Sequence, residues 1–223
     1  MNTIIRKGGL AVFALSILLI TSSCKEEKME AVYKDSYTIS LGEDNFQVPT
    51  EYLLDVDNRM DGAQRYVKLM AKIPDLVPVE NARAYTRLPN RTEKGVNFSL
   101  NYGNGKKMPP DSLLHNWSEQ GHYTVPETWD QEGLIHLGIF KLAGKKKENV
   151  YAYVRDGSPI AQLRCSTYPD TPNPSCRVYQ SYHGNMMSIH VVFDIENLDW
   201  YATEGLDKIL RKVESWRVKP EQE

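Results

Sequence analysis

The sequence predicts an α+β fold: mainly antiparallel β-sheet, a C-terminal amphipathic helix packed on one face, and a short helix near residues 111–120. Short segments that alternate apolar and polar residues recur along the chain, which is typical of antiparallel strands with one covered face. The last part of the chain instead repeats apolar residues at helical spacing. A closing helix is therefore expected to cover the sheet.

The alternating pattern is clearest near the end of the chain. There Met187, Ile189 and Val191 share one face of a strand, while Ser188 and His190 lie on the other face, which is expected to meet solvent. Similar patterns predict the remaining strands, so that the full set is 37–41, 66–73, 96–102, 134–142, 150–155, 160–167, 177–182 and 187–195.

Turn residues divide these strands. Asp156-Gly157 predicts a tight hairpin turn, and the basic run 144–147 predicts another connection. Pro49 restricts the apolar run 46–49 to a sheet edge or a strand end, because proline cannot donate a ladder hydrogen bond.

Two helices are expected. Asp111 follows two prolines and is expected to cap the short helix. Asn197 is expected to cap the closing helix, within which Gly205 costs about 1 kcal/mol relative to alanine. The expected buried face of the closing helix consists of Leu198, Tyr201, Leu206, Ile209, Leu210, Val213 and Trp216.

Composition bounds the class of protein. The chain has 223 residues, 41% hydrophobic and 25% charged, which is ordinary for a globular domain. A formal charge of −2 argues against nucleic acid as a partner, because phosphate binding needs a basic face. We expect a globular body over 36–218, with a possible subdivision near 121–132.

The N-terminus predicts export. Arg6 and Lys7 precede an apolar run at 10–20, which has the length of a signal-peptide core and is too short to span a membrane. The following Thr21-Ser22-Ser23-Cys24 resembles the lipobox of bacterial lipoproteins, although Thr21 stands where an aliphatic residue is usual. Ordinary cleavage near Ser23, leaving Cys24 as an incidental thiol, is the alternative.

The lipobox resemblance implies that residues 1–23 are removed and that Cys24 receives fatty-acyl chains, of the palmitate type, as the new N-terminus. Residues 24–35 then form a charged tether to a membrane that faces the periplasm. Lys25 after the cysteine favours the outer membrane by the same resemblance. Three Asn-x-Ser/Thr sequons leave a eukaryotic secreted glycoprotein as another origin; they begin at Asn90, Asn97 and Asn116.

Three cysteines in an exported chain need an explanation. Lipidation of Cys24 leaves Cys165 and Cys176 as an even pair at the ends of consecutive strands. A disulfide closing so short a loop stabilises by roughly 3 kcal/mol. The alternative is a reactive thiol, but the spacing is not the Cys-x-x-Cys of redox sites.

No catalytic, cofactor or metal site is predicted. The histidines lack metal-ligand spacing, and no nucleophile motif occurs. His115 and His122 could gather with Asp111 and Glu119 near the short helix, although a solvated surface is the simpler interpretation. An exported hydrolase with an unrecognised site remains an alternative.

Two parts of the chain resemble poorly characterised envelope proteins of Gram-negative bacteria. One combines 46–53 (FQVPTEYL) with 73–78 (IPDLVP); the other runs from Cys165 to Cys176 and continues through 206–216. Some such proteins resemble the periplasmic immunity lipoproteins that neutralise lipase effectors of type VI secretion. That resemblance implies protein binding without catalysis, the partner being a toxin. A structural or assembly lipoprotein of the envelope is the alternative.

Mass spectrometry of the native protein tests the predicted anchor. We expect a chain that begins at Cys24 and carries fatty-acyl mass on that residue. Retention of residues 1–23, or an unmodified thiol at Cys24, would contradict both the lipid anchor and the periplasmic address.

Overall fold

The protein is described from a computed structural model, and the described residues all belong to the unit Tyr33–Glu223. The expected signal segment 1–23, Cys24 and nearly all of the tether 24–35 lie outside the described residues. Within the described part, no helix is both long and apolar enough to cross a membrane. The described ranges are 34–54, 59–79, 95–103, 109–118, 122–141, 147–166, 174–183 and 186–219.

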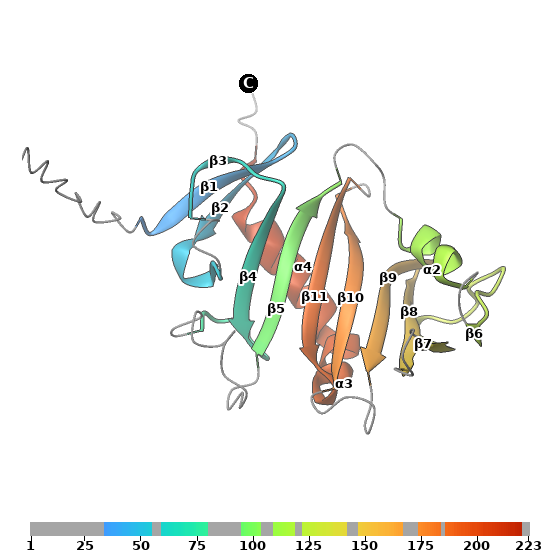
Figure 1. Ribbon diagram of the computed structural model, residues 1–223. Helices are drawn as coiled ribbons and strands as arrows, with labels where there is room; N and C mark the ends of the chain where they lie inside the picture. The colour runs from blue at the N-terminus through green and yellow to red at the C-terminus, as the bar shows by residue number, and fades with distance from the viewer. Residues whose placement is uncertain are drawn as a thin grey trace, which may run out of the picture. The chain divides into compact units, whose positions relative to one another are not determined.

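An eight-stranded antiparallel sheet forms the centre of the body and confirms the predicted α+β class (Figure 1). One of its strands, β8 (Lys147–Arg155), begins within the basic run 144–147 that was expected to form only a connection. In spatial order the strands are β4 (Tyr66–Lys72), β5 (Gly95–Tyr102), β11 (Met187–Asp194), β10 (Ser175–Tyr182), β9 (Ser158–Ser166), β8 (Lys147–Arg155), β7 (Gly133–Lys141) and β6 (His122–Tyr123).

A second, three-stranded sheet is built from β1 (Ser36–Leu41), β2 (Asp44–Pro49) and β3 (Gly62–Ala63). β1 and β2 form an antiparallel hairpin, whereas β3 pairs with β1 in parallel over two residues. Pro49 ends β2 and leads into the 3₁₀ turn η1 (Thr50–Tyr52), as a residue without a backbone N–H should.

The closing helix is assembled from four short pieces: η3 (Ile195–Asn197), α3 (Leu198–Trp200), the π-helical turn η4 (Tyr201–Gly205) and α4 (Leu206–Trp216). The expected cap at Asn197 is wrong, because its buried side chain makes no capping hydrogen bond. A backbone acceptor serves the start of the helix instead, because the N–H of Leu198 donates to the carbonyl of Ile195 in η3.

Gly205 is explained by the ring of Trp200. A Cβ atom built on Gly205 would lie only 2.8–2.9 Å from three carbons of that ring. Real contacts of this kind are not that short, so any larger residue at 205 would force the tryptophan ring or the helix to shift. Between Trp200 and Gly205 the helix is π-helical and not α-helical, over the five residues Tyr201–Gly205.

The apolar face of the closing helix is buried against the large sheet. Figure 1 shows α4 crossing behind the strands. Tyr201 is fully buried, stacks on Phe193 at 5.0 Å between ring centroids, and donates its hydroxyl to Gln180 at 3.2 Å. Trp216 lies 5.0 Å from the ring of Tyr52 and stacks on Phe98. These contacts join the closing helix to η1 and to the central strands β5, β10 and β11.

The helix α2 (Pro110–Ser118) covers part of the opposite face of the sheet. It begins at Pro110, so Asp111 lies within its first turn and is not the cap; proline suits the first helical position because no N–H is needed there. Leu114 is fully buried in a second cluster with Val150 and Phe140. The hydroxyl of Tyr123 donates to the carbonyl of Leu114 at 2.7 Å, which ties α2 to β6.

Cys165 and Cys176 lie directly opposite each other on β9 and β10 and form a disulfide. Their Cα atoms are 4.0 Å apart, and both residues are fully buried in the main core. The bridge therefore fixes the two strand ends from which the loop between them leaves the sheet.

Replacing Gly205 with alanine tests the close approach of Trp200. We expect destabilisation by about 1–3 kcal/mol from overpacking, although alanine is otherwise the better helix former. Urea unfolding measures the change. In a Trp200→Ala background the same substitution should become neutral or stabilising, and the double-mutant cycle isolates the contact. A stabilising effect of Gly205→Ala alone would contradict this explanation.

Candidate functional site

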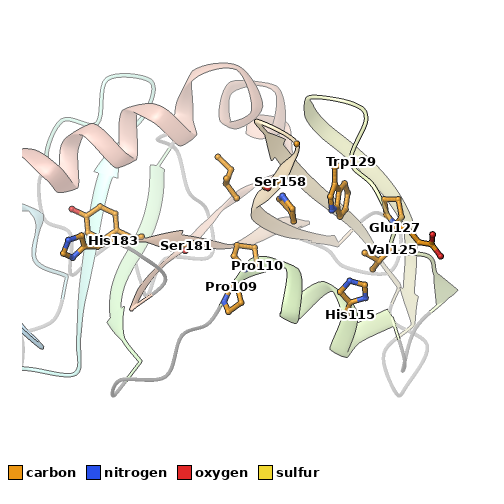
Figure 2. A pocket seen from close by; sticks show the side chains of 14 residues that line it. Pro109, Pro110, His115, Val125, Glu127, Trp129, Ser158, Ser181 and His183 are labelled. Carbon is orange, nitrogen blue, oxygen red and sulfur yellow. The ribbon is translucent and has the colours of Figure 1, made fainter.

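An open groove of about 810 Å³ lies between the start of α2, the segment 125–129 and the β8–β9 turn (Figure 2). It continues to the end of β10, where Tyr182 and His183 line it. Figure 2 shows Trp129 and Glu127 at one side of the groove and His183 at the other, with Ser158 and Pro110 between them.

The lining of the groove is rich in proline. Four prolines contribute, and each fixes its own backbone torsion, so the walls are stiff before anything binds. Trp129 and Val125 also pack against the cluster beneath α2, which holds their segment on the sheet. The groove is concave, as binding sites usually are, and its lining mixes apolar and polar side chains in similar measure. The prolines are Pro109, Pro110, Pro126 and Pro159.

The β8–β9 turn forms one wall of the groove. Asp156 and Gly157 both have positive φ, 51° and 66°, as the expected two-residue hairpin turn requires. The backbone N–H of Gly157 donates to a carboxylate oxygen of Glu132 at 3.1 Å. This bond connects the turn to the residue that directly precedes β7.

A polar clasp of Asp44, His183 and Arg217 holds the ring of His183, which lines the other end of the groove. Asp44 lies 2.7 Å from Nδ1 of His183, and Arg217 places a guanidinium nitrogen 2.9 Å from Nε2 of the same ring. Arginine can only donate, so Nε2 must accept and Nδ1 must carry the proton that is donated to Asp44. The geometry therefore decides which ring nitrogen of His183 donates and which accepts. Arg217 also pairs directly with Asp44 at 2.7 Å.

The clasp joins three distant parts of the chain: the start of β2, the turn after β10 and the residue that follows α4. Next to it, the hydroxyl of Tyr182 donates to Glu214. Burial and this hydrogen bond raise the pKa of Tyr182 far above its ordinary value, so the phenol stays protonated. The groove thus has a fixed wall at this end.

The possible gathering of histidines and carboxylates near α2 stays untested. His115 is exposed and lines the groove, but Glu119 and the side chains of Asp111 and His122 lie outside the described part. Among the described residues, no group of three or more His, Cys, Asp or Glu side chains could hold a metal ion.

His190 is less exposed than its strand position predicts. Its Nε2 lies 3.0 Å from the hydroxyl of Ser188, and the ring of Tyr179 meets it edge-on at 4.5 Å between centroids. Pro110 and Leu113 of α2 line a small pit over the same residues. Because α2 leans over this face, burial lowers the pKa of His190.

The sequence does not predict the groove. Pro126, Trp129 and Pro159 each lie outside the predicted strands and helices, and they come together only when β8–β9 packs beside α2. The ion pair of Arg164 with Glu148, 2.5 Å apart and nearly buried, was missed for the same reason. Clusters of proline beside a tryptophan were the signal available.

The free energy of unfolding is expected to fall as the pH drops from about 7.5 to about 5.5, and His190→Gln should reduce that fall. The pKa of His190 is lowered in the fold, so below the pKa of an unfolded histidine, about 6.5, the unfolded chain takes up a proton that the fold holds less well. The contribution of neutral His190 to the free energy of unfolding is therefore complete above about pH 6.5 and is lost as the pH falls below it. Urea unfolding at both pH values measures it; equal pH dependence in both proteins would contradict the assignment.

No protein-family model matches the sequence, and no relative was found among curated proteins. The fold, however, is shared with solved structures. Smlt3025, an immunity protein of the Stenotrophomonas maltophilia type IV secretion system, aligns over 84% of this chain and 95% of its own, with a TM-score of 0.57 and 19% identity. FrpD, an iron-regulated outer membrane lipoprotein of Neisseria meningitidis, aligns over 82% of this chain and 93% of its own, with a TM-score of 0.53 and 10% identity. At such identities the likeness shows the fold, which this chain has in common with an immunity protein and an envelope lipoprotein.

Proposed function

We propose that this chain is a periplasm-facing envelope lipoprotein, anchored through Cys24, that binds a protein partner through the groove beside α2. The sharper form of the proposal is an immunity protein that neutralises a secreted toxin. The anchor follows from the lipobox resemblance of residues 21–24, and Lys25 favours the outer membrane.

The groove is the observation that carries the proposal. Its volume and its stiff, proline-rich lining suit an extended or looped part of another protein, because little conformational freedom is lost in the walls on binding. Trp129 is the kind of large aromatic anchor that dominates binding energy at protein interfaces.

The shared fold supports the same conclusion. Smlt3025 belongs to a type IV system, whereas the sequence resemblance concerned type VI immunity lipoproteins. We therefore propose toxin neutralisation without assigning the secretion system. FrpD, an outer membrane lipoprotein on the same fold, supports the envelope address without favouring either role. The second candidate is a structural or assembly lipoprotein of the envelope.

Affinity capture from cell envelopes tests the proposal. The tagged full chain is expected to retain one protein at near-stoichiometric yield, and Glu127→Arg or Trp129→Ala should lower that yield about tenfold or more. Glu127 is exposed, so its reversal should leave the fold intact. The matched control is Glu51→Arg, which reverses an exposed carboxylate on η1, away from the groove. This variant should capture the partner normally.

The captured protein then separates the two candidates. A partner that kills cells when exported alone, and spares cells that also express this chain, supports the immunity role. Capture of an assembly component without toxicity favours the structural role. Undiminished capture by both groove variants, with their thermal unfolding unchanged, would refute the groove as the binding surface.

A further inference from the structure

The large sheet ends in an edge that is only partly paired. β6 is two residues long and pairs only with Gly138 and Ile139 of β7. Residues 133–136 of β7 pair with β8 on one side, and Leu137 stands at a β-bulge between His136 and Gly138. Within the described part of the chain, residues 133–137 have no strand on the other side. A row of backbone N–H and C=O groups is therefore available along this stretch.

The segment before β7 leaves the edge uncovered because it packs elsewhere. After β6 the chain turns onto the α2 side of the sheet, where Val125 and Trp129 join the cluster of Leu114. It returns only at Glu132, whose carboxylate binds the backbone of the β8–β9 turn. The same segment thus builds the groove and exposes the edge.

The free edge lacks most of the usual protection against strand addition. β7 is apolar (GLIHLGIFK), has no proline, and carries its only permanent cation at its end, Lys141. Most of the strand is half-exposed, and Ile139 is 40% exposed. Natural sheets normally blunt such an edge with charges, proline, a β-bulge or a covering segment, and of these the stretch 133–137 has only the bulge at Leu137.

The opposite edge of the sheet shows that protection clearly. On β4, the carbonyl of Lys68 accepts from the N–H of Leu54 at 3.0 Å, and the N–H of Lys72 donates to Val77 at 2.8 Å. Covering segments and two lysines therefore occupy the β4 edge. The contrast singles out β7.

Acidic side chains gather at the start of the free edge. Asp130, Glu132 and Asp156 are all exposed, and Glu132 is joined to the turn that contains Asp156. Among the described residues, no lysine or arginine lies within ion-pairing distance of these three carboxylates; Arg155 next to them is paired with Asp207 at 2.8 Å. A basic segment would thus meet uncompensated negative charge here.

We propose that residues 133–137 of β7 accept an extended segment of the partner protein as an added strand, and that this segment carries lysine or arginine where it passes the three carboxylates. The inference rests on the proposed binding function and names the chemistry of the partner. Backbone hydrogen bonds supply the pairing, and the charges set which segments bind. A second copy of this chain fits less well, because five residue pairs bury far less than the roughly 1,200–2,000 Å² of a stable interface.

Amide hydrogen exchange on the full chain in detergent solution tests the proposal with synthetic peptides of about ten residues. One peptide alternates valine with lysine, a second replaces lysine with glutamate, and a third carries a central proline. The lysine peptide should slow exchange of amides within 133–137, and the other two should bind about tenfold more weakly or worse.

Isosteric variants test the role of charge. Asp130→Asn, Glu132→Gln and Asp156→Asn together should weaken the lysine peptide about tenfold while keeping the hydrogen-bonding shapes. Glu51→Gln, Glu196→Gln and Asp199→Asn remove the same charge from exposed positions on other elements and should bind normally.

Three results would overturn the proposal: no protection within 133–137 by the lysine peptide, equal binding of the glutamate peptide, or protection of these amides in the free protein through a dimer detected by sedimentation. Failure here leaves partner capture through the groove intact. If the lysine peptide protects 133–137 but affinity capture retains no protein, the added-strand site stands and only the proposed function is refuted.

Discussion

Burial of the closing helix against the central strands is the interaction on which the structure depends. Leu206, Ile209, Val213 and Trp216 contribute the apolar face, and the strands beneath come from both halves of the chain. Each fully buried side chain of this size contributes about 1.5–3 kcal/mol. Residues after Leu206 are thus needed to complete a core that begins at Tyr37. The clasp of Asp44, His183 and Arg217 also links the residue after α4 to β2 and to the turn after β10.

The second constraint is that the sheet is covered on both faces but by different helices. On β8, Tyr151 and Tyr153 face the main core while Val150 and Ala152 face the cluster of Leu114. Strands β7, β8 and β9 therefore need cover on the α2 side as well. The helix α2 is too short to supply all of it, and Val125 and Trp129 complete the cover. The groove is the space left between these two partial covers.

Local sequence patterns predict the strands, turns and helices well, but they do not predict the groove. Alternation in 187–195 and the turn at Asp156-Gly157 act within a few residues, so the sequence shows them directly. Asn197 has the right residue type for a cap, yet the preceding 3₁₀ turn makes that side chain unnecessary. The reason for Gly205 lies in a contact with Trp200 that no pattern displays. The groove joins residues from 109 to 183, and its assembly depends on strand order, which alternation alone does not determine.

A shared fold at 10–19% identity leaves function to the surfaces that the scaffold presents. In this chain the segment 124–132 decides two of them at once. Packing Trp129 over the sheet creates a wall of the groove, and the same detour leaves β7 without a full-length neighbour on the side away from β8. If residues 124–132 instead extended β6 along β7, the free edge of β7 would be paired and the groove would lose the wall that contains Trp129. Binding to a partner by this protein is therefore expected to depend on a connection between strands more than on the strands themselves.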